Sequence, residues 1–269
     1  YTGNGSARNI DQTGNSTFQP DFVWLKNRSQ ADSHALFDAG QGVTKYFSTD
    51  SAAQQITNSN SLTSFDSDGF GLGTGAGGFN DSSENFVAWQ WKAGGGAGSS
   101  NEDGSINTTS TTVDQTSGTS ISIYTGNATS GATVGHGLGA VPQMIIIKPL
   151  TATEGTAVYH VCTGNTKGGY MNMTNSFFTG TYYWNDTSPT STVFSLGNHV
   201  LNNGSGKVMV AYAFTNKIGF SKFGKYYGTG SSTIPPLVTM GFKPSLVLIK
   251  NSGATGDWLL YDNSRSPFN

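Results

Sequence analysis

The side chains that most often catalyse reactions or bind metals are sparse and scattered in this sequence. The four histidines, His34, His136, His160 and His199, are not paired at a spacing that suits zinc. The 16 acidic residues show no pair placed for glycoside hydrolysis. Because Cys162 is the only cysteine, an internal disulfide and a cysteine-rich metal site are excluded. No Gly-x-Ser-x-Gly sequence marks a nucleophile elbow. We therefore predict that the protein is not an enzyme and holds no cofactor and no metal.

Three glycine-containing segments resemble ligand-binding loops. Asp66-Ser-Asp68-Gly69 has the alternating oxygens that begin a calcium loop, but it lacks the third acid and the closing glutamate. An Asp-Gly pair is equally typical of a turn. The runs 73–78 and 135–139 have the glycines of a phosphate cradle, yet no helix pattern follows either run to direct its N-terminus at an anion. We interpret all three segments as turns.

A cluster of aromatic residues beside polar groups is the strongest candidate for ligand contact. It consists of Tyr182, Tyr183, Trp184 and Asn185, and it has no counterpart in the first part of the chain. Aromatic faces next to amide groups suit the apolar faces of sugars, and they are also enriched in protein interfaces. Three roles stay open: packing in the core or at a sheet edge, contact between subunits, and contact with a glycan.

The elements that would position these residues follow a threefold internal repeat. In each copy a tyrosine turn is followed by a proline six residues before a lysine, and the lysine lies eleven residues before an aromatic residue. Shared offsets of this kind predict equivalent strands in successive copies. The landmark residues are Tyr1, Pro20 and Lys26 in the first copy, Tyr124, Pro142 and Lys148 in the second, and Tyr227, Pro244 and Lys250 in the third.

Two positions of the repeat carry titratable groups whose role we predict to be structural. The landmark lysines end apolar strands, where we expect the stem to cover the core and the ammonium to reach water. The position after the repeat aromatic is occupied by Asp38, His160 and Asp262. Because histidine cannot replace a shared catalytic carboxylate, we predict a turn or capping role for this position.

Composition and pattern together predict an all-β fold. The chain is only 11% charged but 12% aromatic, and disordered chains are poor in aromatic residues. The apolar runs after the landmark prolines suit strands buried on both faces, and no sustained helical period is present. We predict tandem antiparallel β-sandwich repeats of jelly-roll or concanavalin-like type, joined by Gly- and Asn-rich turns. Their bounds are 1–92 for the first, 93–118 for a linker or long loop, 119–217 for the second and 218–269 for a partial third.

The two ends of the chain fall inside copies of this repeat. The first copy lacks the lead-in that precedes the tyrosine of the other two, and the third copy lacks its second half. We expect the terminal copies either to be cut within the repeat, or to close on each other or on neighbouring chains. A net charge of −2 without a basic run argues against nucleic-acid binding. No apolar stretch approaches the length of a membrane span, so we also expect no membrane insertion.

The repeats resemble a domain of unknown function that recurs in structural proteins of marine bacteriophages. The matching stretches are Tyr-Thr-Gly-Asn-Gly at 1–5, Phe-Gln-Pro-Asp-Phe-Val-Trp-Leu-Lys-Asn-Arg at 18–28, Ser-Asp-Gly-Phe-Gly-Leu-Gly at 67–73 and Val-Ala-Trp-Gln-Trp-Lys at 87–92. Gln19 and Pro149 depart from the usual pattern, at positions expected in loops. The resemblance implies a lectin-like β-sandwich in a virion component, and it implies no established ligand or active site.

From these observations we expect a bacteriophage virion structural protein, a tail fibre, appendage or capsid fibre component that serves display and host-surface adhesion. Its expected partners are other virion proteins, further copies of itself and a host surface glycan, and its expected location is the outside of the particle after synthesis in the bacterial cytoplasm. The main alternative is a carbohydrate-binding module of a larger extracellular protein. A spike that cleaves polysaccharide is a third reading, which would require a catalytic acid.

Overall fold

The computed structural model describes residues 1–14 and 17–265, and strands dominate these residues. Strand accounts for 36% of the chain and helix for 4%, which confirms the predicted all-β class. Among the described residues, all named strand pairs are antiparallel, and no sheet is closed. The helical elements are short: η1 (Gly75–Gly77), α1 (Thr181–Trp184) and α2 (Val200–Asn203).

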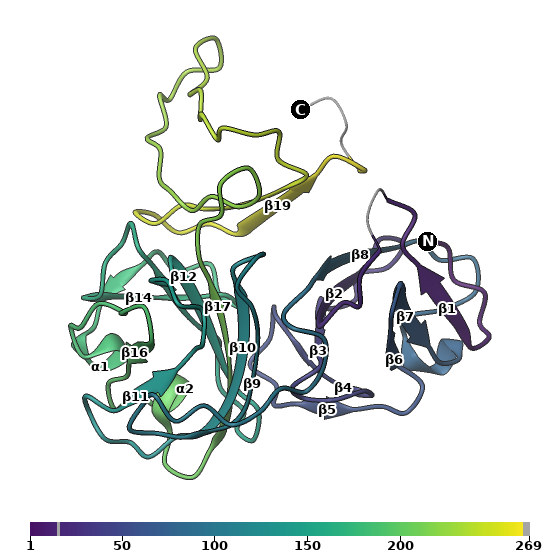
Figure 1. Ribbon diagram of the computed structural model, residues 1–269. Helices are drawn as coiled ribbons and strands as arrows, with labels where there is room; N and C mark the ends of the chain where they lie inside the picture. The colour runs from purple at the N-terminus through teal and green to yellow at the C-terminus, as the bar shows by residue number, and fades with distance from the viewer. Residues whose placement is uncertain (15–16, 266–269) are drawn as a thin grey trace.

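The N-terminal part is a sandwich of two sheets (Figure 1). The larger sheet has the order β5-β4-β3-β2-β8, and the smaller has the order β1-β7-β6. Apolar residues on their facing sides, among them Val23, Phe37 and Phe70, form the first core cluster. The bounds are β1 (Arg8–Asp11), β2 (Phe22–Asn27), β3 (Ala35–Asp38), β4 (Lys45–Ser48), β5 (Ile56–Thr57), β6 (Leu62–Asp66), β7 (Gly69–Leu72) and β8 (Phe86–Trp91).

The middle part is built around a seven-stranded sheet of order β15-β14-β13-β12-β17-β10-β9. The small sheet β11-β16 and the two α-helices cover one face of it, where Tyr124, Ile145 and Phe194 belong to a second core cluster. The bounds are β9 (Thr108–Asp114), β10 (Thr119–Thr125), β11 (Thr133–Gly135), β12 (Met144–Pro149), β13 (Ala157–His160), β14 (Lys167–Tyr170), β15 (Phe178–Thr179), β16 (Val193–Ser195) and β17 (Val208–Phe214).

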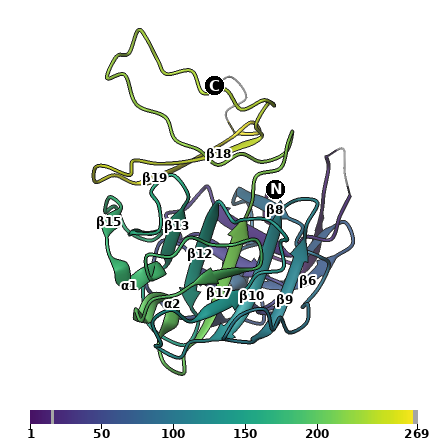
Figure 2. The same cartoon turned by 60° about the vertical axis from the view of Figure 1, so that its left-hand side comes forward.

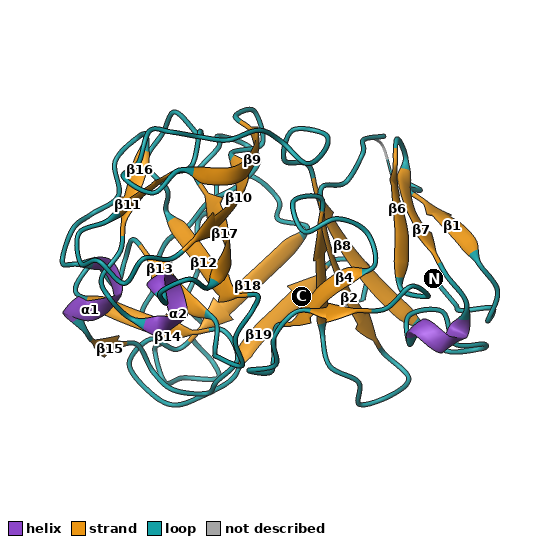
Figure 3. Ribbon diagram, turned by 90° about the horizontal axis from the view of Figure 1, so that it is seen from below, coloured by secondary structure: helices purple, strands orange, loops and turns teal. Residues whose placement is uncertain are grey.

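A third core cluster joins these two parts to a C-terminal hairpin, β18 (Leu246–Lys250) and β19 (Trp258–Asp262). Trp24 and Trp89 enter it from the larger N-terminal sheet, and Ile146 and Tyr212 enter it from the seven-stranded sheet. Side chains of β18 and β19, including Leu248, pack against the same cluster. The hairpin therefore lies over both large sheets, as the view in Figure 2 and the view from below in Figure 3 show. Strands β2 and β12 are buried on both faces because each contributes to two clusters.

The three hairpins that contain the landmark lysines pair in one register. Phe22 lies opposite Asp38 in β2–β3, Met144 opposite His160 in β12–β13, and Leu246 opposite Asp262 in β18–β19. The lead strand of each hairpin begins two residues after its landmark proline. The sequence offsets of the predicted repeat thus correspond to equal backbone positions in the three hairpins.

Two segments differ from the simplest reading of their sequence. The stretch 93–118, predicted as a linker or long loop, contains β9, whose Thr and Val residues pair with β10 along most of its length. β-branched threonine favours a strand even where large apolar residues are absent. The start of the stretch 93–118 is also held in place, because the buried Asp21 carboxylate accepts hydrogen bonds from the backbone N–H groups of Ala93, Gly95 and Gly96. In contrast, residues 222–245, which were predicted to belong to a partial third β-sandwich repeat, form no strand.

Candidate functional site

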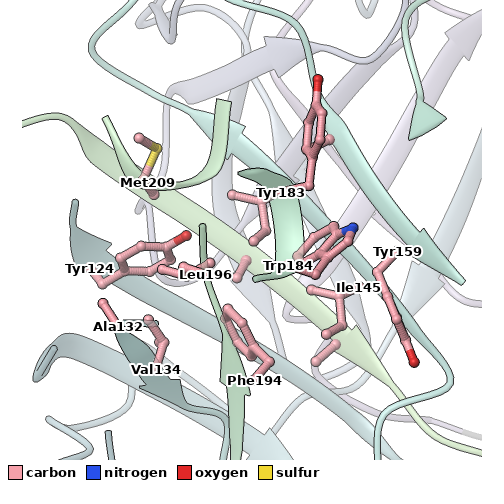
Figure 4. Close-up of a cluster of buried hydrophobic side chains, with 14 of the residues drawn as sticks. Tyr124, Ala132, Val134, Ile145, Tyr159, Tyr183, Trp184, Phe194, Leu196 and Met209 are labelled. Atoms are coloured by element: carbon pink, nitrogen blue, oxygen red, sulfur yellow. The ribbon is translucent and has the colours of Figure 1, made fainter. Parts of the chain in front are cut away.

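The predicted aromatic cluster lies on α1, and most of it faces inward. Tyr183 and Trp184 are 0% and 1% exposed and belong to the core of the middle part (Figure 4). Gly180 precedes the helix, and Asn185 ends it in the left-handed conformation at φ 52°. Of the four residues, Tyr182 and Asn185 reach the surface, so these two are the ones placed for contact with a ligand.

Tyr182 forms an exposed aromatic stack with His199. The two rings are 5.1 Å apart and nearly parallel, and Tyr182 is 43% exposed. His199 also stacks on the buried Tyr183 at 4.5 Å, and its Nδ1 accepts a hydrogen bond from Leu201 N at the start of α2. Burial lowers the pKa of His199, so its imidazole is held neutral near neutral pH. Tyr182 and His199 therefore form a small, uncharged aromatic surface that packs on the buried Tyr183 ring.

The landmark lysines bind backbone carbonyls and do not simply extend into water. Each ammonium donates to the carbonyl six residues further on, Lys26 to Asp32, Lys148 to Glu154 at 2.6 Å and Lys250 to Gly256. The expectation of a solvated ammonium is wrong for Lys148, whose side chain is fully buried. Burial lowers the pKa of Lys148 to about 8. The lysine thus closes the hairpin loop that follows its strand.

The position after the repeat aromatic caps a turn, as predicted. Asp38 Oδ1 accepts from Gln41 N at 2.8 Å, and Asp262 Oδ1 accepts from Arg265 N at 2.8 Å. His160 Nδ1 accepts from Cys162 N at 3.2 Å. All three groups therefore satisfy backbone N–H groups that the end of the strand leaves without a partner.

Two of these caps also bind a side chain from another part of the molecule. The Tyr212 hydroxyl on β17 donates to Asp38 Oδ2, and Trp89 Nε1 on β8 donates to Asp262 Oδ2 at 3.2 Å. Arg265 pairs with Asp262 and lies over the Trp89 ring, 4.9 Å from its centroid. Burial raises the pKa of Asp38, whereas the hydrogen bonds and charge of Arg265 outweigh burial and lower that of Asp262. These polar contacts fix the orientation of the parts around their common core.

Two buried asparagines, which the sequence reasoning missed, hold the tyrosine turns in place. Asn80 Oδ1 accepts from Asn4 N at 3.1 Å, and Asn203 Oδ1 accepts from Asn127 N at 2.8 Å. Their amide groups donate to the carbonyls of Gly73 and Gly197, at 3.0 and 2.7 Å respectively. An asparagine six or seven residues after each Phe-x-Leu-Gly segment was the available signal.

The remaining candidates for chemistry do not converge. Asp66 and Asp68 flank the tight turn between β6 and β7, where Gly69 has a φ of 146°. Within residues 1–14 and 17–265, no three His, Cys, Asp or Glu side chains gather at metal-binding distances. The glycine run 73–78 contains the single turn η1, and 135–139 leads into a loop, so both are turns. In the part of the chain that the structure describes, no helix is long and apolar enough to cross a membrane.

One small cleft opens at the edge of the N-terminal sandwich, with a volume of about 190 Å³. Tyr46 and Phe79 form its apolar side, and Asp32 and Ser48 contribute polar groups. It has room for a few waters but not for a drug-sized ligand, which needs about 300 Å³ or more. We therefore assign it no ligand.

The largest accumulation of exposed apolar residues lies in the C-terminal part. We call the side of the β18–β19 hairpin that faces away from the common core the open face; it consists of Val247, Ile249, Leu259 and Tyr261. Leu259 is 47% and Tyr261 41% exposed, whereas their counterparts in the first two hairpins are buried. Further exposed apolar residues precede the hairpin: Ile218, Phe220, Tyr226, Tyr227, Ile234, Leu237 and Val238. Exposed large apolar residues are thus concentrated in the C-terminal part of the chain, and exposed apolar surface is typical of interaction sites.

Comparison with known proteins gives a family and no function. A family model described as a domain of unknown function, DUF7483, matches residues 1–269. No curated protein and no solved structure matches the chain significantly.

Proposed function

The chain belongs to the DUF7483 family over residues 1–269, and on this premise we propose that it is a structural protein of a bacteriophage virion. It would form part of a tail fibre, tail appendage or capsid fibre, in which tandem lectin-like β-sandwich modules display a host-binding surface. The resemblance of the motifs at 1–5, 18–28, 67–73 and 87–92 to phage structural proteins supports this origin. We place the protein on the outside of the particle, in contact with other virion proteins and with copies of itself.

The observation that carries this proposal is the contrast between buried polar groups and exposed apolar ones. The titratable residues of the repeated frame, such as Lys148 and Asp38, are buried and hydrogen-bonded within the fold. The open face and the segment before it instead expose large apolar side chains. Groups that are engaged in packing are not free for chemistry, whereas exposed apolar surface favours protein contacts. This distribution suits an assembly component.

Purified virions of the phage that encodes this chain provide the direct test. Quantitative mass spectrometry of the particles should find the chain at a fixed ratio to the major capsid protein, and antibodies against it should label one location by electron microscopy. A chain that is produced during infection but absent from washed particles would overturn the proposal.

The exposed Tyr182–His199 stack favours a second candidate function, carbohydrate binding as a module of a larger extracellular protein. Sugar rings pack on exposed aromatic faces, and one weak contact per module is strengthened when many copies act together. On a glycan array, Tyr182→Ala should abolish binding while the equally exposed Tyr226→Ala retains it. The lectin function is refuted if the two variants bind alike, or if the native chain binds no glycan.

A further inference from the structure

An acidic side chain lies near the exposed Tyr182–His199 stack, and the repeated frame does not require it. Glu154 follows β12, six residues beyond Lys148, whose ammonium donates to the Glu154 backbone carbonyl at 2.6 Å. In the third hairpin the equivalent carbonyl belongs to Gly256. The frame therefore needs the backbone at this position and no side chain, so the Glu154 carboxylate is available for another role.

The charge of Glu154 acts on the aromatic rings of this site. The side chain is half-buried, and within residues 1–14 and 17–265 its carboxylate forms no ion pair and no hydrogen bond. Burial lowers the pKa of His199, and the Glu154 charge partly opposes this shift. Burial and a hydrogen bond to Tyr170 raise the pKa of Tyr183, and the Glu154 charge raises it further. The carboxylate thus lies close enough for its field to reach both rings.

Two tyrosine hydroxyl groups meet beside these rings. The Tyr183 hydroxyl donates to the Tyr170 hydroxyl at 3.0 Å, and the Tyr170 hydroxyl keeps its own proton for a further acceptor. Figure 4 shows the Tyr183 hydroxyl pointing away from the other labelled side chains of the core cluster. Tyr170 itself is half-buried. The surroundings of the stack therefore combine an apolar ring face, a carboxylate acceptor and a hydroxyl donor within the middle part of the chain.

This combination matches the two kinds of surface on an uncharged sugar ring. The C–H face of the sugar packs on an exposed aromatic ring, here Tyr182, which is 43% exposed. The sugar hydroxyl groups donate to a carboxylate in charge-assisted hydrogen bonds. A sugar that carries a carboxylate, sulfate or phosphate instead brings a like charge to Glu154. Two like charges about 4 Å apart repel strongly enough to lower affinity about fivefold even in water.

The Lys148 ammonium does not compensate for this repulsion. It is fully buried, and it donates to the backbone carbonyls of Ser51 and Glu154. An acidic ligand at the surface therefore cannot form an ion pair with it.

We propose that Glu154 makes the Tyr182–His199 site selective for neutral sugars over acidic ones. One ring of a neutral polysaccharide packs on Tyr182, and its hydroxyl groups face Glu154 and Tyr170. This inference rests on the carbohydrate-binding function proposed above, and it adds the class of sugar and the residue that selects it.

Matched pairs of oligosaccharides test the selectivity. Tetrasaccharides of glucose, galactose and mannose are compared with the same oligomers after oxidation of each C6 to a carboxylate, which keeps the linkages. Calorimetric titration of the full native chain in dilute buffer should show tighter binding of a neutral oligomer than of its acidic counterpart, by about fivefold or more. The ratio should shrink in concentrated salt, because salt screens the repulsion.

Glu154→Gln removes the charge and keeps the size of the side chain. We expect this variant to bind the neutral oligomer about threefold more weakly, because hydrogen bonds to an amide are weaker than those to a carboxylate. It should bind the acidic oligomer more tightly than the native chain does, so that the two affinities become nearly equal. Glu102→Gln is the matched control, since Glu102 is an exposed acid in the segment before β9, and it should keep the native ratio. Thermal melting of both variants checks that they are folded.

The outcomes separate this inference from the function on which it rests. If neutral oligomers bind and Tyr182→Ala abolishes their binding, but Glu154→Gln keeps the native ratio, the site binds sugars and Glu154 does not select them. Equal or tighter binding of acidic oligomers by the native chain also overturns the inference. If no oligomer binds the native chain, the carbohydrate-binding function fails, and the inference fails with it.

Discussion

The hydrogen bond between Tyr212 and Asp38 joins two parts of the molecule inside their common core, and its removal gives a sharp prediction. Both residues are fully buried. The Asp38 carboxylate accepts from the Tyr212 hydroxyl and from the backbone and side-chain nitrogens of Gln41. A hydrogen bond to a charged group contributes about 1.5–3 kcal/mol. We expect Tyr212→Phe to lower the free energy of unfolding by about 2 kcal/mol at neutral pH, because Asp38 keeps its two bonds to Gln41.

The loss of stability caused by Tyr212→Phe should depend on pH. Burial raises the pKa of Asp38 above its usual value of 3.8. A carboxyl group whose pKa is higher in the folded chain binds a proton more tightly there, so the folded state gains stability as the pH falls through that pKa. Loss of the Tyr212 hydroxyl removes a bond that favours the charged form, which raises the pKa of Asp38 further. The difference between native chain and variant should therefore be largest at neutral pH and shrink as Asp38 becomes protonated.

Tyr124→Phe is the matched control. The Tyr124 hydroxyl is equally buried, but it donates to the neutral backbone carbonyl of Asn202. Its removal should lower stability by about 1 kcal/mol, without a dependence on pH in the acid range. Urea denaturation at a series of pH values upward from about pH 4, followed by tryptophan fluorescence, measures both variants on the side of the usual carboxyl pKa towards which burial shifts Asp38. If Tyr212→Phe and Tyr124→Phe lower the free energy of unfolding equally at every pH, Asp38 does not act as a charged, buried acceptor.

Three further variants probe the same packing. Because the pKa of Lys148 is lowered to about 8 in the folded chain, stability should rise as the pH rises from about 8 towards 10.5, and Lys148→Met should remove this rise in denaturation midpoints. Asn80→Ala and Asn203→Ala should each cost about 2–4 kcal/mol in urea denaturation, since each leaves several buried backbone groups without a partner. Gly126→Ala should lower the melting temperature by several degrees, because a Cβ there collides with the backbone of Gly204.

Each of these predictions has a control in the same chain. Lys45 is exposed at the start of β4, so Lys45→Met should retain the rise in stability between about pH 8 and pH 10.5 that Lys148→Met removes. Asn107 is exposed before β9, so Asn107→Ala should change the free energy of unfolding by no more than about 0.5 kcal/mol. A Cβ at Gly228 meets nothing within 4 Å, so Gly228→Ala should leave the melting temperature unchanged. Equal effects in a variant and its control would contradict the contact on which the prediction rests.

Much of the strand framework could be predicted from local pattern, because strand formation here follows short-range chemistry. The proline, apolar run and lysine around Pro142 and Lys148 mark β12 at its observed place. The exchange of Asp38 for His160 was enough to indicate a capping role, since both side chains can accept a backbone N–H. β9 was missed because its threonines carry no apolar alternation, and its pairing with β10 depends on a strand already present beside it.

The candidate site was less predictable, because exposure is decided by the whole fold. Tyr182, Tyr183 and Trp184 are alike in sequence, yet one turn of helix places Tyr182 outside and the other two in the core. No local pattern fixes the direction of that turn. The exposed apolar residues of the open face were predicted as an ordinary sandwich strand, since β18 has the same sequence character as β2 and β12.

By itself, the sequence determined the all-β class, the strands that follow the landmark prolines, and the scarcity of groups for catalysis. These properties depend on residue type and spacing along a few neighbouring positions. The tertiary structure alone decided that the large sheets meet face to face and that Lys148 and Asp38 are buried between them. Those features arise when segments more than a hundred residues apart pack together, and such contacts leave no mark in the local pattern of either segment.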